Sequence, residues 1–173
     1  MPVTAADAKR ALRTEAREVR RRIAADPADR LVRSSRIWAR IVALTDLGAP
    51  GTGGARKVML FESLPTEPDT AAWITWCHDH DVAVYLPAVD GPDLRVQPGD
   101  LDPAALDVVV VPGLAFTTDG RRLGQGGGHF DRFLPRLRAE CVTIGAAFAE
   151  QIVADLPTEP HDVHLTHVAT DAP

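Results

Sequence analysis

The amino-acid sequence predicts an α/β fold, with a single domain over residues 1–173, a mostly parallel central sheet, helices on both faces of the sheet and further helices at the N-terminus. The first observation is a change of hydrophobic period, from helical spacing before the loop "LGAPGTGGARK" to strand-like runs after it. The second is the succession "KVMLFES", "PDTAAWITWCHDH" and "DVAVYLPAV", typical of a βαβ unit, which requires parallel strands. The third is "LDVVVVPGLAF", which is apolar at consecutive positions, as expected of a central strand buried on both faces.

Two helices are predicted before the loop. Thr4 and Asp7 resemble a capping box, so the first helix is expected over residues 5–25, ending at Asp26 and Pro27. Pro27 suits the first turn of the second helix, which the loop ends. Apolar residues recur at helical spacing through both segments: Ala8, Leu12, Val19, Ile23, Leu31, Ile37, Ile41 and Leu44. The glycines of the loop lack the Lys-Ser/Thr ending of a P-loop, so it is interpreted as a surface loop.

The C-terminal third continues the alternation. A helix is expected over residues 130–140, with Pro135 near its first turn. "CVTIGAAF" predicts a fourth strand, "AEQIVADL" a short helix and "LTHVAT" an edge strand.

Composition bounds the function class. The net charge of −5 gives no reason to expect a nucleic-acid partner, although basic residues concentrate between residues 9 and 40. No apolar run reaches the length of a membrane span, and the start "MPVTAADAKR" has no signal-peptide pattern, so we expect a cytoplasmic protein without a membrane partner. Cys77 and Cys141 form no motif and are expected to be reduced, structural thiols.

A glycine cluster follows the central strand, in "VVVVPGLAFTTDGRRLGQGGGHFDR". Ligands of parallel sheets lie beyond the carboxyl ends of the strands, and glycines there let backbone N–H groups approach phosphate oxygens. Arg121 and Arg122 provide cationic donors, and Asp131 can hold Mg²⁺ against the same phosphates. A glycine turn without a ligand is the alternative. A dinucleotide fingerprint is disfavoured, because the sixth position counted from Gly124 is His129.

The longer string "VVVPGLAFTTDGRRLGQGGGHFDRFL" resembles the signature of the 5-formyltetrahydrofolate cyclo-ligase family, the methenyltetrahydrofolate synthetases. Three more blocks occur in the family's order. "KRALRTEAREVRRRI" looks like its N-terminal Lys-x-x-x-Arg helix, "ESLPTEPDT" like its Ser-x-x-x-Glu-x-x-Thr segment, and "EQIVADLPTEPHDVHLTHVAT" like its C-terminal tail. The four blocks together cover most of the chain.

The resemblance implies an enzyme that uses ATP and Mg²⁺ to convert 5-formyltetrahydrofolate to 5,10-methenyltetrahydrofolate. The formyl oxygen is phosphorylated, N10 attacks, and ADP and phosphate are released. It also implies an α/β fold similar to that of sugar-phosphate isomerases and coenzyme A transferases. The expected partner is a small reduced folate, and we expect a monomer.

By the same resemblance, the site residues fall into four groups. Those expected at the nucleotide are Lys9, Arg13, Arg122, Leu123, Gly124, Gln125, Gly126, Gly127, Gly128, His129 and Phe130. Those expected at the folate are Glu62, Glu67, Gln125, Gly126, Gly127, Gly128 and His129. The expected metal ligands are Asp131 and Asp162, and the expected catalytic residues are Arg122, His129 and Asp131. The other basic residues of the first helix, Arg17, Arg20 and Arg21, are interpreted as surface charge, and Thr70 as a helix cap.

Two departures from the family pattern keep alternatives open. His129 stands where the family usually has a tyrosine, which replaces a phenol by an imidazole that changes charge near neutral pH. The segment 87–107 is shorter than usual, with "LRVQP" as the remnant of a region that covers the folate. The main alternative is therefore a nucleotide-binding relative with another substrate or no catalysis. A sugar-phosphate isomerase or hydrolase is a second one, and zinc at His161, His164 and His167 is disfavoured because the spacing fits no ligand pattern.

Overall fold

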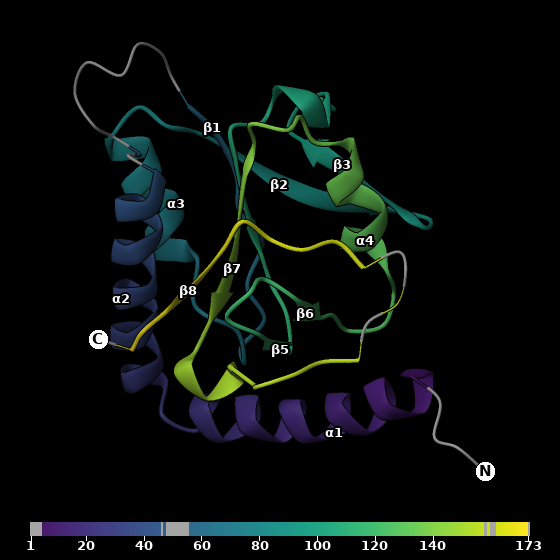
Figure 1. The fold of residues 1–173 in the computed structure, drawn as a ribbon. Helices are drawn as coiled ribbons and strands as arrows, with labels where there is room; N and C mark the ends of the chain where they lie inside the picture. The colour runs from purple at the N-terminus through teal and green to yellow at the C-terminus, as the bar shows by residue number, and fades with distance from the viewer. Residues whose placement is uncertain (1–4, 46, 48–55, 158, 160–161, 173) are drawn as a thin grey trace.

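The computed structural model describes residues 5–45, 47, 56–157, 159 and 162–172. A six-stranded sheet forms its centre, in the order β3-β2-β1-β4-β7-β8 (Figure 1). The strands are β1 Lys57–Met59, β2 Ala83–Asp90, β3 Asp93–Gln97, β4 Val108–Val111, β7 Val142–Ala147 and β8 His167–Thr170. All neighbours pair in parallel except β3, which is antiparallel to β2. The mostly parallel sheet is confirmed, and β8 is the predicted edge strand.

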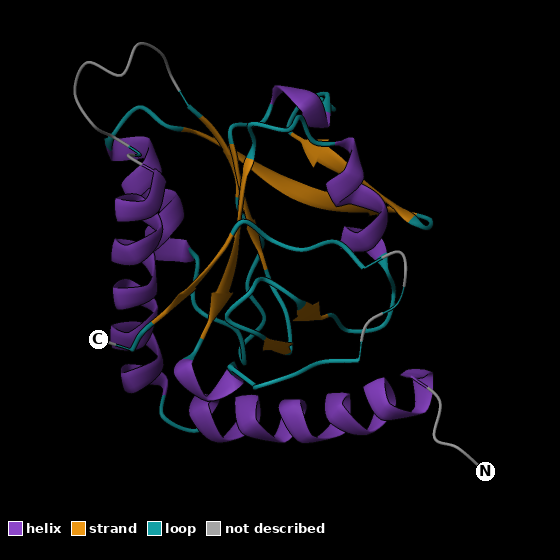
Figure 2. Ribbon diagram, in the orientation of Figure 1, coloured by secondary structure: helices purple, strands orange, loops and turns teal. Residues whose placement is uncertain are grey.

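Helices cover both faces of this sheet (Figure 2). The helices are α1 Ala5–Ala24, α2 Pro27–Thr45, α3 Ala71–Asp79 and α4 His129–Phe133. On one face, α2 and α3 enclose a core that contains Trp38, Trp73 and Val110. On the other face, Phe133 of α4 packs in a second core with Met59. The long helix α1 lies across the end of the sheet to which β7 points, that is, beyond the carboxyl ends of the parallel strands (Figure 1).

The first two helices match their predicted bounds to within a residue. The proposed cap residue Thr4 and most of the glycine loop before β1 lie outside the described residues. Among the described residues, none of the helices combines the length and apolar character that a bilayer span requires. Cys77 and Cys141 are buried and free, and burial raises their pKa values to about 12 and about 11 respectively, as expected of structural thiols.

The helix predicted over residues 130–140 is wrong in length. The α-helix ends at Phe133, and a 3₁₀ turn, Leu134–Arg136, replaces its continuation. Pro135 has no N–H to donate and its ring crowds the preceding turn, which explains the early end. The short helix expected over 149–156 is likewise only a 3₁₀ turn, Ala149–Gln151.

Several elements were not predicted. β2 and β3 form a hairpin, β5 Ala115–Phe116 and β6 Arg122–Leu123 form a two-stranded ribbon, and Pro103–Ala105 is a 3₁₀ turn. The strand β1 is shorter than predicted. Thr70 is also not a side-chain cap, because its hydroxyl donates to the Phe61 carbonyl at 2.7 Å, and the Asp69 carboxylate instead accepts from the Ala71 N–H.

Candidate functional site

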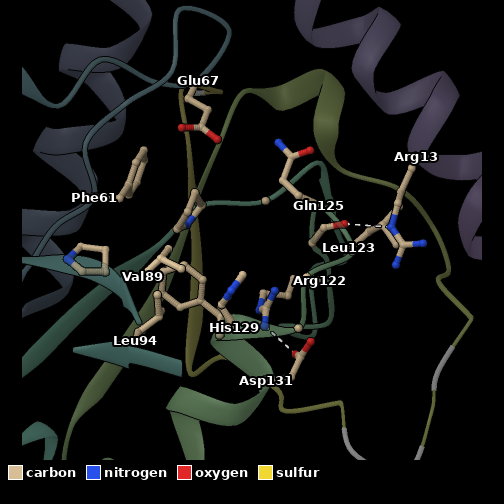
Figure 3. A pocket seen from close by; sticks show the side chains of 18 of the residues that line it. Arg13, Phe61, Glu67, Val89, Leu94, Arg122, Leu123, Gln125, His129 and Asp131 are labelled. Carbon is tan, nitrogen blue, oxygen red and sulfur yellow. Dashed lines mark hydrogen bonds and ion pairs between the residues drawn. The ribbon is translucent and has the colours of Figure 1, made fainter. Parts of the chain in front are cut away.

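A cavity of about 480 Å³ brings together all the residues that the family resemblance assigned to the nucleotide, the folate, the metal or catalysis. It is bounded by α1, the segment after β1, the β2–β3 hairpin, the glycine loop and the C-terminal tail. Its lining contains Lys9, Arg13, Glu62, Glu67, Arg122, Leu123, Gly124, Gln125, Gly126, Gly127, Gly128, His129, Phe130, Asp131 and Asp162. In Figure 3, Phe61, Val89 and Leu94 lie toward one side of the pocket, and Arg13 and Asp131 toward the other. The site therefore has an apolar end and a charged end.

The glycine loop forms the floor of the charged end. Gly126 and Gly128 have φ values of 113° and 68°, which side-chain-bearing residues rarely adopt. A Cβ on Gly124 would lie 2.9 Å from Nη1 of Arg122. The Nε of Arg13 donates to the Gly124 carbonyl at 3.1 Å, which ties α1 to the loop. Because α4 has only five residues, the arginines and the backbone, rather than a long helix dipole, supply most of the positive potential here.

Arg122 is the most deeply buried cation of the charged end, with 4% of its side chain exposed. Its Nη2 is 2.5 Å from Oδ1 of Asp131, and its guanidinium lies 5.6 Å from the ring centre of Phe130. Burial lowers the pKa of Arg122, while Asp131 and Asp162 oppose this shift. Its Nε is buried without an acceptor. Buried N–H groups are rarely left unpaired, so this atom points to an acceptor that a ligand would bring.

Lys9 is the second buried cation, and it lies between two carboxylates. Its Nζ is 2.7 Å from Oε2 of Glu159 and 2.8 Å from Oδ2 of Asp162. Burial lowers the pKa of Lys9, but these two carboxylates outweigh burial and raise it above its usual range. Glu159 was missed by the sequence analysis, although it lies three residues before Asp162 in the same tail. The only signal for it was that proximity.

The predicted metal ligands both line the cavity, and each is paired with a cation in this structure. Asp131 pairs with Arg122, and Asp162 pairs with Lys9. Within the described part of the chain, no group of three His, Cys, Asp or Glu side chains is placed to hold a metal ion. His161, from the disfavoured zinc cluster, lies outside the described residues.

The neighbouring Arg121 is not a cavity residue, contrary to its predicted role as a second phosphate donor. Its Nη1 is 2.6 Å from the carboxylate of Asp155, and its Nε is 3.1 Å from that of Asp119. Arg121 lies directly before β6, whose first residue is Arg122. Of these two arginines, only Arg122 lines the cavity.

Part of the shortened segment 87–107 forms the apolar end of the cavity. Val89 and Leu94 come from the two strands of the β2–β3 hairpin, and both line the cavity. Val89 is 68% exposed, so its apolar side chain is free to cover a ligand. Of the two glutamates among the predicted folate contacts, Glu62 is exposed and Glu67 is only 5% exposed.

Two arginines interpreted as surface charge contact the site. Arg20 is 2% exposed, so that interpretation is wrong, and its guanidinium pairs with Glu67 at 3.2 Å. Burial lowers the pKa of Arg20, and Glu67 opposes this shift. Arg17 is exposed as predicted, but it donates to the Gln125 carbonyl at 3.3 Å. Arg21, which pairs with Glu18, is a surface charge as predicted.

Comparison with known proteins gives consistent matches. A family model described as the 5-formyltetrahydrofolate cyclo-ligase family matches residues 89–171. The 5-formyltetrahydrofolate cyclo-ligase of Haemophilus influenzae is 31% identical over 137 residues, which cover 64% of this chain and 73% of that protein. The mouse 5-formyltetrahydrofolate cyclo-ligase is 25% identical over 96% of this chain and 95% of its own length. The Mycolicibacterium smegmatis protein of the same name is 42% identical over 64 residues, and that match spans only 33% of its length.

Solved structures give the same fold. A 5,10-methenyltetrahydrofolate synthetase from Mycoplasma pneumoniae aligns with a TM-score of 0.81 at 23% identity, covering 95% of this chain and 99% of that one. The NMR structure of the Aquifex aeolicus 5,10-methenyltetrahydrofolate synthetase aligns with a TM-score of 0.78, also at 23% identity, over 95% of this chain and 90% of its own.

Proposed function

Because the chain belongs to the 5-formyltetrahydrofolate cyclo-ligase family, we propose that it is a ligase that converts 5-formyltetrahydrofolate to 5,10-methenyltetrahydrofolate with ATP and Mg²⁺, releasing ADP and phosphate. The proposed reaction closes a ring by forming a carbon–nitrogen bond. The observation that carries the proposal is that one cavity holds a charged end, with Arg122 and Lys9, and an apolar end, with Val89 and the buried Glu67.

The charged end fits a triphosphate. The buried, unpaired Nε of Arg122 needs an acceptor, and the left-handed glycines keep the loop free of side chains where a phosphate would approach. Lys9, Arg13 and Arg122 would hold the phosphate oxygens, together with the glycine loop. ATP supplies the phosphoryl group that turns the formyl oxygen into a leaving group, after which N10 of the folate closes the ring.

The carboxylates of the charged end fit a divalent cation. Asp131 and Asp162 would hold Mg²⁺, whose charge offsets that of the phosphates. Each would then exchange its present cation partner, Arg122 or Lys9, for the metal. Those two side chains would in turn be free to donate to phosphate.

His129 lies at the start of α4, next to Arg122 in Figure 3 and between the two ends of the cavity. We assign it a hydrogen bond to the formyl group, which a ring N–H donates. The Phe130 ring, 5.6 Å from the Arg122 guanidinium, would keep this side chain in place to stabilise negative charge on the transferred group after Asp131 has moved to the metal.

The β2–β3 hairpin bears on the main alternative, a nucleotide-binding relative without folate chemistry. The shortened segment still places Val89 and Leu94 on the wall of the cavity, which supports a pocket for a flat apolar ring. Glu67, at the same end, would accept hydrogen bonds from N–H donors of the pterin. These observations favour the catalytic proposal.

The test is formation of the methenyl chromophore from 5-formyltetrahydrofolate, ATP and Mg²⁺. Arg122→Met is expected to lose at least about 100-fold in kcat/KM, since charged groups at a transferring phosphoryl contribute about 2.7 kcal/mol or more. Arg121→Met is the matched control, because this neighbouring arginine does not line the cavity, and it should retain activity.

Absence of the chromophore with folded wild-type protein, at every pH from about 5 to 8, would refute the proposal. Thermal stabilisation by Mg²⁺-ATP but not by the folate would instead support the nucleotide-binding alternative, since a ligand stabilises only the state that binds it.

A further inference from the structure

Arg20 of α1 is buried without lining the cavity, and its hydrogen-bond acceptors lie in or directly beside the cavity wall. Its Nε donates to the Thr66 carbonyl at 3.1 Å, its Nη2 to the Thr66 hydroxyl at 2.7 Å, and its Nη1 to the Gly113 carbonyl at 3.5 Å. Nη2 also lies 3.2 Å from Oε1 of Glu67. One guanidinium thus joins α1 to the loop after β1 and to the turn after β4.

The carboxylate of Glu67 is fixed from both sides. Its Oε1 pairs with Arg20, and its Oε2 accepts the Leu64 N–H at 3.0 Å. A carboxylate oxygen has two lone pairs, so each oxygen keeps one for a donor brought by a ligand. Glu67 and Leu64 both line the cavity. The arrangement presents a charged acceptor in one defined orientation at the apolar end.

Because both side chains are buried, the orientation of the Glu67 carboxylate depends on its ion pair with Arg20. Arg20 is 2% exposed and Glu67 is 5% exposed. A carboxylate that loses its cation in such surroundings is strongly destabilised, so it either takes up a proton or turns toward water. Either change removes the ionised acceptor from the cavity.

Helix α1 extends this connection to the charged end. Lys9, Arg13 and Arg20 are four and seven residues apart in sequence, which places them on one face of the helix. Lys9 contacts Asp162, and Arg13 contacts Gly124. The same helix therefore holds residues of both ends of the cavity.

We propose that Arg20 is a positioning residue that orients Glu67 to recognise the N–H donors of the reduced pterin, which rests on the proposed folate activity. Its role differs from those of Lys9 and Arg13, because it acts through Glu67 and the loop containing Thr66. Its removal should therefore affect folate recognition and leave nucleotide binding in place.

Steady-state kinetics with each substrate varied in turn would test this. Arg20→Met is expected to raise the KM for 5-formyltetrahydrofolate about 10-fold or more, with a smaller change in kcat and an unchanged thermal shift with Mg²⁺-ATP. Arg20→Lys, which keeps the charge but not the fork of donors, should recover part of the loss. Arg21→Met is the matched control, because that arginine is exposed on the same helix, and it should behave as wild type.

A merely structural role would give another pattern. Loss of folded protein lowers the apparent kcat and the Tm without ligand, and it leaves the folate KM unchanged. An unchanged folate KM in folded Arg20→Met would overturn the proposal. If Arg20→Met does not fold, Thr66→Val decides: it removes one acceptor of Arg20 and keeps both charges, and it should raise the folate KM about 3-fold or more.

If wild type and Thr66→Val then have the same KM for the folate, the proposed role of Arg20 is refuted. Double substitution Arg20→Met with Glu67→Gln adds a check, since two residues that act through one carboxylate should give a KM increase well below the product of the single effects. A full product of the two effects would count against the proposal. Failure of the proposed activity is distinguishable, because wild-type protein would then form no methenyl product at all.

Discussion

Gly120 is where the segment that leads to Arg122 crosses the segment that follows Asp162. Its φ is 91°, and its carbonyl accepts the Leu165 N–H at 2.8 Å. A Cβ added here would lie 2.2 Å from the Leu165 carbonyl oxygen, a backbone atom that cannot turn aside. Gly120→Ala is therefore expected to separate the two segments that carry these cavity residues.

Gly91 provides the matched control. It also has a positive φ, 59°, but a Cβ there would meet nothing within 4 Å. Gly91→Ala should thus lose only the conformational term, about 1–2 kcal/mol for a left-handed L-residue. Gly120→Ala adds the contact with the backbone and the loss of a buried hydrogen bond, about 1–3 kcal/mol more. The expected total for Gly120→Ala is about 2–5 kcal/mol.

Denaturant unfolding would measure both variants, with thermal unfolding as a second probe. For a chain of this size, 1 kcal/mol corresponds to about 3 °C in Tm, so the expected losses are about 3–6 °C for Gly91→Ala and about 6–15 °C for Gly120→Ala. Stabilisation by Mg²⁺-ATP should also weaken only in Gly120→Ala. Equal destabilisation of the two variants would refute the steric argument.

Three further predictions follow from the charges and the thiols. Burial raises the pKa of Asp171, but Arg33, 2.5 Å away, outweighs burial and lowers it; Arg33→Met should lose about 3 kcal/mol in urea unfolding at pH 7. That difference should shrink as the pH falls below about 4, because a carboxylate with a lowered folded pKa contributes stability above its unfolded pKa and loses it on protonation. Lys9→Met should weaken Mg²⁺-ATP binding about 10-fold or more in a thermal-shift titration, and unchanged binding would contradict its assigned role. Cys77 and Cys141 should resist a thiol reagent at pH 8 until the protein unfolds, because burial raises both pKa values; rapid labelling of native protein would contradict this.

The fold was predictable where the hydrophobic period is long. α1 and α2 each repeat an apolar stripe over five turns or so, and their bounds agree with the prediction. β3 has only five residues, and "LRVQP" gives too short an alternation to separate a strand from a loop. The helix over 130–140 failed for another reason. Its composition suits a helix, but one missing N–H at Pro135 stops the hydrogen-bond ladder.

The site was predictable from the glycine loop, and less so from the arginine run on α1. Arg20, Arg21 and Arg22 are identical in type, yet Arg20 is 2% exposed and the side chains of Arg21 and Arg22 are 63% and 76% exposed. The helical spacing could have predicted the burial of Arg20, because Arg20 lies on the same face of α1 as the buried residues Ala16 and Ile23. Burial of an arginine is rare, so its charge favoured the surface interpretation.

Lys9 and Arg122 at the charged end of the cavity are already paired with carboxylates, and this arrangement limits what can bind there. Lys9 is held by Glu159 and Asp162, and Arg122 by Asp131. An anion alone would take a cation from its half-buried acid and leave that carboxylate without its counter-charge, and a metal alone would take the acid from its buried cation. A ligand that brings phosphates and a divalent cation together satisfies both members of each pair. We infer that the ion pairs keep the buried cations in place before binding and favour a metal-bound polyphosphate over either component alone.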